Sequence, residues 1–206
     1  MNIEHPAQVS IDALRTNVSA SFEEARAMPP QVYTSSEFNQ AELEQIFKKD
    51  WFCAGRANVL ANPGDYVTCE LAEQPVIVLR DQNNTLRAMS NVCRHRMSTL
   101  LNGSGSTKVI VCPYHAWTYN LDGSLRGAPA MNANKAFCRN QYKLPAIACE
   151  EWLGWMFINL NPDAKPVSEE LTEVQELIKG YDMTNYTETF FEEHIWDTNW
   201  KILAEN

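Results

Sequence analysis

The chain reads CRH at residues 93–95 and CPYH at residues 112–115, and these two short segments decide its fold. Each segment offers one thiol and one imidazole, and sixteen residues separate His95 from Cys112. Paired cysteines and histidines at short spacing are typical of metal sites. The four residues Cys93, His95, Cys112 and His115 are therefore the candidate ligands of a metal centre.

The order of the ligands distinguishes between metals. In a zinc finger, two cysteines lie close together in the sequence and are followed by two histidines that lie close together. Here each short segment contains one cysteine and one histidine. A [2Fe–2S] cluster of the Rieske kind needs two cysteines on one iron and two histidines on the other. Two facing loops that each supply Cys and His meet that demand. Zinc and four unrelated core residues remain as alternatives.

The surrounding sequence resembles the Rieske domain of ring-hydroxylating-type oxygenase α subunits. The resemblance runs from about residue 30 to the last residue. It rests on CRHR at 93–96, CPYHAW at 112–117, WF at 51–52, GR at 55–56, PGDY at 63–66, PVIVLRD at 75–81, GWMFINL at 154–160 and NWKILAEN at 199–206. Two positions depart from it, because Met97 and Ala116 stand where many relatives have glycine.

The resemblance implies a cluster with Cys93 and Cys112 on one iron and His95 and His115 on the other, with Trp117 shielding it from water. Respiratory Rieske proteins carry an additional disulfide and a hydroxyl donor, and neither is present at the corresponding positions here. We therefore expect a reduction potential at the low end of the Rieske range, near roughly −150 mV.

The resemblance also implies a second metal, a mononuclear non-haem Fe(II) held by two histidines and a carboxylate. Asn206 matches an asparagine near that iron, although not a ligand. The sequence holds only four histidines, and His194 lies in a strand-like stretch. The sequence thus predicts a truncated α subunit that carries electrons but has no catalytic residues of its own and is inactive alone.

The family's partners are expected here too: a flavin/iron–sulfur reductase as electron donor, a homotrimer in the full-length form, and a small-molecule substrate. The predicted activity is mono- or dioxygenation of an aromatic ring or a quaternary amine. The residues of the N-terminal lead resemble oxygenases of the choline, carnitine and betaine branch and favour the amine. The alternative is a stand-alone Rieske ferredoxin-type electron carrier, which is usually about half this length.

Composition excludes some partners. The net charge is −9, and residues 163–206 hold 11 acidic and 3 basic residues, so no basic stripe for nucleic acid exists. The sequence shows no secretory signal and no membrane-spanning run, which predicts a cytoplasmic protein with no membrane partner. The cysteines outside the ligand set are expected to be buried thiols; they are Cys53, Cys69, Cys138 and Cys149.

The order of elements predicts a mainly β fold. Short strands separated by turns indicate an antiparallel Rieske domain over residues 46–162. A helical N-terminal lead is expected over 1–45, with a helix starting at Asn39 and ending near Trp51. The start of an α+β catalytic domain is expected over 163–206, with a helix capped by Ser168, a strand over 186–196 and a helix from Trp200.

Overall fold

The structure is a computed structural model that describes residues 6–131, 133–190 and 192–205. The chain forms two compact units. One comprises Lys48–Tyr186, and the other combines Met1–Phe47 with Thr187–Asn206. No helix among the described residues is long and apolar enough to cross a membrane.

A seven-stranded antiparallel sheet is the frame of the larger unit, with the strand order β1-β10-β9-β4-β3-β2-β5. The central strand β3 reads PVIVL within its bounds, and four of its residues are buried, as expected for a strand covered on both faces. The strands are β1 (Phe52–Arg56), β2 (Asp65–Leu71), β3 (Gln74–Arg80), β4 (Leu86–Ser90), β5 (Ser104–Ser106), β9 (Ala146–Trp152) and β10 (Trp155–Asn159).

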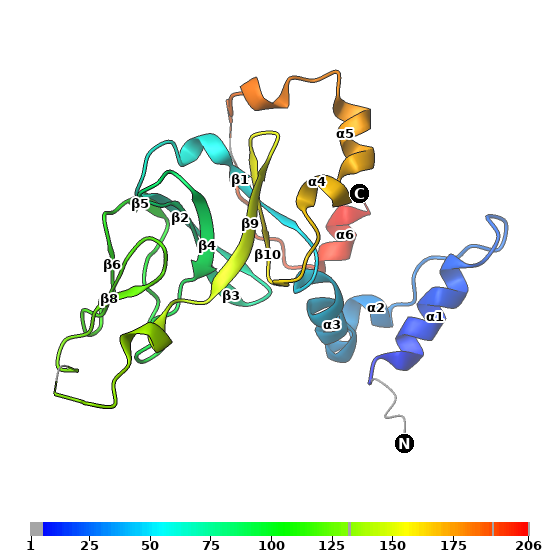
Figure 1. The fold of residues 1–206 in the computed structure, drawn as a ribbon. Coiled ribbons are helices and arrows are strands. Elements are labelled where there is room, and N and C mark those ends of the chain that lie inside the picture. Colours follow the sequence, from blue (N-terminus) through cyan, green and yellow to red (C-terminus); the bar gives the residue numbers. More distant parts are fainter. Residues whose placement is uncertain (1–5, 132, 191, 206) are drawn as a thin grey trace. The chain divides into compact units, whose positions relative to one another are not determined.

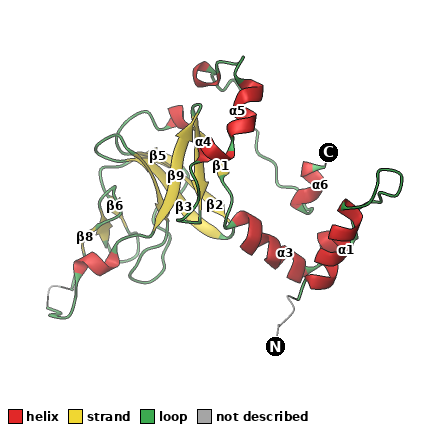
Figure 2. Ribbon diagram, turned by 45° about the vertical axis from the view of Figure 1, so that its right-hand side comes forward, coloured by secondary structure: helices red, strands yellow, loops and turns green. Residues whose placement is uncertain are grey.

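A second, three-stranded antiparallel sheet contains β6 (Ile110–Val111), β7 (Thr118–Tyr119) and β8 (Leu125–Gly127). Figures 1 and 2 both show this small sheet at one end of the main sheet. The two sheets share one apolar core, in which Ile77 and Leu79 of β3 join Tyr119 of β7. Cys93 and Cys112 belong to the same core, so the predicted ligand loops are anchored in the best-packed part of the unit.

Short helices complete the larger unit. The 3₁₀ helix η2 (Ala57–Val59) follows β1, and η3 (Arg139–Tyr142) precedes β9. After β10 come α4 (Val167–Glu170), α5 (Thr172–Ile178) and the 3₁₀ helix η4 (Met183–Asn185). Arg56 at the end of β1 holds η4, because its guanidinium donates to the carbonyls of Met183 (3.1 Å) and Tyr186 (2.8 Å).

The smaller unit is helical. It contains α1 (Gln8–Val18), α2 (Gln31–Thr34), α3 (Ser36–Glu42), a π-helical turn η1 (Leu43–Phe47) and α6 (Trp200–Ala204). Val32, Phe38 and Ala41 form its apolar core. A buried ion pair joins its two chain segments, with Lys201 Nζ 2.8 Å from both carboxylate oxygens of Glu42.

The mainly antiparallel β fold with N-terminal helices is confirmed, and so is the helix from Trp200. Two predicted helix starts are wrong. The helix expected from Asn39 begins at Ser36, because the Ser35 hydroxyl accepts the Phe38 N–H at 3.1 Å and caps it earlier. The helix expected from Ser168 begins at Val167, directly after Pro166.

The strand predicted over 186–196 is also wrong. Residues 187–190 and 192–196 run as irregular chain. A strand is held by hydrogen bonds to a neighbouring strand, and the described residues offer none to this stretch. The side chains of this stretch are largely exposed, including the apolar ones of Ile195 and Trp196.

Candidate functional site

The first ligand loop follows β4 and closes on itself. The backbone N–H of Met97 donates to the Cys93 carbonyl at 3.1 Å, and the Cys93 N–H donates to the Ser98 carbonyl at 2.9 Å. Met97 has a φ of 54°, in the left-handed region that favours glycine. Glycine adopts this conformation without steric cost, whereas methionine here has a strained backbone.

The second ligand loop follows β6 and repeats the same pattern. The Ala116 N–H donates to the Cys112 carbonyl at 3.0 Å, and the Cys112 N–H donates to the Trp117 carbonyl at 2.8 Å. Ala116 has a φ of 57°, matching Met97 of the first loop. The two loops therefore share one backbone design, although the histidine is the second residue after Cys93 in the first loop and the third residue after Cys112 in the second.

The loops bring the four candidate ligands together. The thiols of Cys93 and Cys112 are buried, and the rings of His95 and His115 lie 4.8 Å apart between centroids. The Nδ1 atoms of both histidines are buried and have no hydrogen-bond partner among the described residues. A buried imidazole nitrogen without a partner is costly unless something binds it, so these atoms fit metal ligation.

The chemistry of the donor set agrees with a two-iron cluster. Among the described residues, no three side chains of the ligating types converge on one point as the ligands of a single ion do. A Rieske cluster divides its ligands two and two between its irons, so it requires no such convergence. Two thiols and two imidazole nitrogens on facing loops thus match the group that the sequence predicts.

The surroundings of the ligands favour their metal-binding forms. Burial opposes ionisation of Cys112, but the backbone N–H groups of Tyr114 and His115 outweigh it and lower the pKa of the thiol. Desolvation and the nearby His115 lower the pKa of His95, which favours its neutral form. Thiolate and neutral imidazole are the forms that bind iron.

Tyr119 is a site residue that the sequence analysis missed. Its hydroxyl lies 3.3 Å from Cys93 Sγ and accepts the Arg94 N–H at 3.0 Å. Burial and then the contact with Cys93 raise the pKa of this phenol, so the hydroxyl stays protonated and is able to donate to the sulfur. The only available sequence signal was an aromatic residue at the second position after Trp117, on a strand that leaves the ligand loop.

Trp117, which the sequence predicts to shield the cluster, packs against the first ligand loop. Its indole is buried and stacks on the His95 ring, with 4.8 Å between centroids and 9° between planes. Tyr142 and Phe137 pack edge-on against the other parts of the same indole at 5.3 Å and 5.7 Å. A layer of aromatic rings thus separates one side of the ligand loops from water.

The remaining predicted residues lie elsewhere. Asn206 falls outside the described residues. His194 is exposed in the irregular stretch, 3.1 Å from Glu192. Burial raises the pKa of the Cys149 thiol to about 12. The expectation of buried thiols is wrong for Cys53 and Cys138, which are exposed because one lies on an edge strand and the other in a surface loop.

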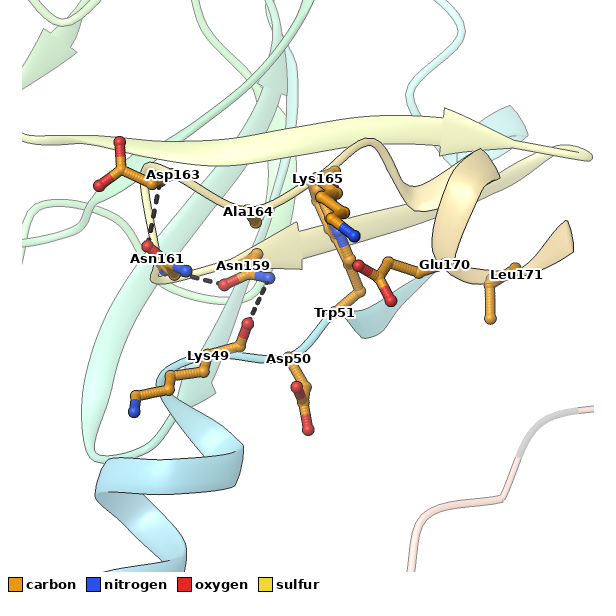
Figure 3. A pocket seen from close by; sticks show the side chains of 10 residues that line it. All are labelled: Lys49, Asp50, Trp51, Asn159, Asn161, Asp163, Ala164, Lys165, Glu170 and Leu171. Atoms are coloured by element: carbon orange, nitrogen blue, oxygen red, sulfur yellow. Dashed lines mark hydrogen bonds between the residues drawn. The ribbon is translucent and has the colours of Figure 1, made fainter.

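A cavity of about 400 Å³ is lined by residues just before β1, residues at and after the end of β10, and residues at the end of α4 (Figure 3). Asn159 donates to the Lys49 carbonyl at 2.8 Å and accepts the Asn161 N–H at 2.8 Å, while the Trp51 indole donates to the Lys165 carbonyl at 2.8 Å. These hydrogen bonds join the residues just before β1 to the turn after β10. The cavity lies where these segments meet, and no residue of the ligand loops lines it.

Comparisons with known proteins agree with this geometry. The family described as "Rieske [2Fe-2S] domain" matches residues 50–146. The chain is 38% identical to the carnitine monooxygenase oxygenase subunit of Escherichia coli (strain K12), over 94% of the chain and 52% of that protein. It is 30% identical to the glycine betaine monooxygenase oxygenase subunit of Pseudomonas aeruginosa (strain UCBPP-PA14), over 99% of the chain and 46% of that protein.

The solved structures give the same grouping. The quaternary ammonium Rieske monooxygenase CntA matches with a TM-score of 0.83 and 34% identity, over 88% of this chain and 51% of that one. Naphthalene 1,2-dioxygenase from Rhodococcus sp. matches with a TM-score of 0.73 and 27% identity, over 83% and 39%. The chain spans about half the length of the curated relatives it matches. It carries a Rieske [2Fe–2S] domain and belongs to the Rieske oxygenase α subunits, in the branch of the carnitine, glycine betaine and choline monooxygenases.

Proposed function

We propose that this chain is the electron-transfer portion of an oxygenase α subunit that uses O₂ to oxidise a quaternary amine. The observation that carries the proposal is the pair of matching loops, which place two buried thiols beside two imidazoles whose buried Nδ1 atoms have no partner among the described residues. When bound there, a [2Fe–2S] cluster supplies a site that accepts and releases one electron.

We infer that Cys93 and Cys112 hold one iron through sulfur, and that His95 and His115 hold the other through nitrogen. The chain's own groups then have distinct tasks. Backbone N–H groups around Cys112 favour its thiolate, and the Tyr119 hydroxyl donates toward the Cys93 sulfur.

Trp117 stacks on His95, orients the ring and excludes water from it. These residues hold, orient and desolvate the cluster, and none of them acts on a substrate.

Similarity to oxygenases extends beyond the cluster domain, which favours this function over a stand-alone ferredoxin. The family match ends at residue 146, whereas the carnitine and glycine betaine relatives align over 94–99% of the chain. The quaternary amine is favoured over an aromatic ring because the carnitine monooxygenase subunits are 34–38% identical to this chain, whereas the naphthalene dioxygenases are 27–29% identical.

The remaining expectations belong to the same proposal. A flavin/iron–sulfur reductase supplies electrons, a homotrimer forms in the full-length protein, and the domains divide at about residues 45 and 162.

The protein is placed in the cytoplasm. Its six free cysteines are in keeping with a reducing compartment. The mononuclear iron is bound by residues other than those of this chain, so residues 1–206 alone do not oxygenate a substrate.

Ligand substitution tests the cluster site. Purified residues 1–206 should contain two irons and two acid-labile sulfides per chain and show a Rieske electron paramagnetic resonance signal after reduction. His95→Ala or His115→Ala should abolish both, because one iron loses half its protein ligands. His194→Ala is the matched control, since that imidazole is exposed and distant in sequence. A His95→Ala protein with the iron content of the control would refute the site.

Product analysis tests the division of labour. Residues 1–206, loaded with the cluster and given a reductase, O₂ and L-carnitine or glycine betaine, should consume reductant without forming an oxidised amine. Formation of product by this polypeptide would show that it contains a complete oxygenase centre.

A further inference from the structure

The loop between β8 and β9 differs in charge from the rest of the molecule. Residues 123–149 contain four basic residues and no acidic residue, in a chain whose net charge is −9. All four basic side chains are exposed: Arg126, Lys135, Arg139 and Lys143. Asp122 lies close enough to Lys143 to feel its charge, so that lysine is partly balanced. Lys135 and Arg139 make the loop positive at its tip.

The same loop lies directly behind the cluster ligands. Phe137 and Tyr142 stack on each other at 4.9 Å, and both contact the indole of Trp117. Trp117 in turn stacks on His95 at 4.8 Å. Only two ring-to-ring contacts therefore separate the half-buried Tyr142 from a proposed iron ligand. Figures 1 and 2 show the loop beyond β8 at the small-sheet end of the larger unit, away from α4 and α5.

We propose that the segment Lys135–Lys143 is the surface on which an acidic electron-donor protein docks to reduce the cluster. The proposal rests on the cluster function argued above. Charge complementarity selects the partner: the positive loop attracts a donor with a negative surface, whereas the rest of this negative chain repels it, so the donor is guided to the loop. Proximity to His95 through the aromatic layer selects the kind of partner, because an electron is transferred only between centres that are close together.

The other basic residues near the site belong to the first ligand loop. Arg94 and Arg96 flank His95 at the exposed tip of the first ligand loop, where Met97 is also exposed. The segment Lys135–Lys143 is separate in sequence from that tip and reaches His95 through the aromatic layer.

The step itself is simple. One electron leaves the reduced [2Fe–2S] centre of the donor, which returns to its oxidised form, and is taken up at the site formed by the two ligand loops. No covalent bond is made or broken. A plant-type ferredoxin is a suitable donor, because its potential of about −400 mV lies below the Rieske range and makes the transfer downhill.

Charge reversal in the loop tests the proposal. The variant Lys135→Glu/Arg139→Glu is compared with Lys165→Glu/Lys179→Glu, which makes the same change in net charge at exposed lysines near α4 and α5. Each is loaded with cluster, and its reduction by an acidic plant-type ferredoxin is followed by stopped-flow absorbance over a range of salt concentrations. Binding of the oxidised ferredoxin is measured by surface plasmon resonance. Photoreduced 5-deazariboflavin, which is uncharged, serves as the second reductant.

The loop variant should be reduced by ferredoxin about tenfold more slowly than the control at low salt, with weaker binding and a flatter salt dependence. The difference should nearly vanish at about 1 M salt, where the Debye length falls to about 3 Å. Both variants should be reduced equally fast by deazariboflavin. Equal ferredoxin rates and affinities in the two variants would overturn the docking surface. Failure of the unmodified protein to bind a cluster would instead refute the proposed function.

Discussion

At the residue scale, the hydrogen bonds around the cluster sulfurs set what the site can do. The sequence motifs alone point to a low-potential Rieske centre, and the structure adds one hydroxyl that can donate to sulfur, that of Tyr119 beside Cys93. Hydrogen bonds to sulfur stabilise the reduced, more negative cluster and raise its potential. Tyr119 therefore holds the potential somewhat above the value that the ligand set alone would give.

Tyr119→Phe should lower the midpoint potential. Loss of one hydrogen bond worth about 1 kcal/mol corresponds to about 40 mV for a one-electron couple. Redox titration followed by circular dichroism or paramagnetic resonance measures the change. Tyr142→Phe is the control, because that phenol belongs to the aromatic layer and has a ring contact, not a hydrogen bond, with the site. An unchanged potential in Tyr119→Phe would show that the hydroxyl does not donate to the cluster.

The residue scale also shows the limit of motif reading. Spacing alone was enough to select Cys93, His95, Cys112 and His115 as candidate ligands, because ligand order is a local property of the sequence. Tyr119 was missed because its contact with Cys93 joins residues 26 positions apart. Such a contact depends on how two sheets pack, and no local pattern encodes it.

At the scale of elements, the turn between β3 and β4 is built around one carboxylate. Asp81 is buried and accepts the N–H groups of Asn83 at 2.8 Å and Thr85 at 3.0 Å, and it pairs with Arg87. Burial opposes its ionisation, but the Thr85 N–H, Arg87 and the Asn83 N–H outweigh burial and hold the pKa of Asp81 below its usual range. The ionised carboxylate thereby fixes the hairpin.

Asp81→Asn should destabilise the larger unit by about 1–3 kcal/mol at pH 7, because the charged acceptor is lost. A carboxyl with a lowered pKa stabilises the fold above its unfolded pKa of about 3.9, and this contribution disappears as the pH falls through the folded value. The gap between the variant and the unmodified protein should therefore shrink from pH 7 toward pH 3.

Urea unfolding at several pH values measures this gap. Glu173→Gln, an exposed carboxylate at the start of α5, is the control and should change stability little at any pH. A gap that stays constant with pH would show that the Asp81 charge is not the cause.

The elements also show what sequence patterns capture. The short strands and their turns were predicted because alternation and turn residues are local signals. The start of α3 was misplaced because two candidate caps, Ser35 and Asn39, lie four residues apart, and only the backbone decides which one captures an N–H group. The strand expected over 186–196 was wrong because alternation describes a strand only where a neighbouring strand exists.

At the scale of the whole molecule, the stability of the smaller unit depends on a buried ion pair, and both of its residues belong to that unit. Lys201 and Glu42 are both buried, and the ammonium lies within about 6 Å of the rings of Tyr33, Phe38 and Trp200. A buried ion pair that loses one partner leaves an uncompensated charge in the core.

Lys201→Met should destabilise the smaller unit by about 3–5 kcal/mol. Limited proteolysis should then cleave residues 6–47 or 187–205 much faster, whereas the visible spectrum of the cluster should be retained, because its ligands lie in the other unit. The double variant Glu42→Gln/Lys201→Met should regain part of the resistance, since no buried charge remains. Protease resistance unchanged in Lys201→Met would contradict a supporting role for the pair.

The chain passes between its two compact units at only two places, after Phe47 and after Tyr186. The stretch beyond Tyr186 is held to the N-terminal helices by Lys201 and by the Tyr33 hydroxyl, which donates to Glu205 at 2.8 Å. Cleavage of one peptide bond just beyond Tyr186 would therefore break the chain, but the two fragments would stay associated through these contacts. Two polypeptides made apart and mixed would reassemble by the same contacts, as a split protein does.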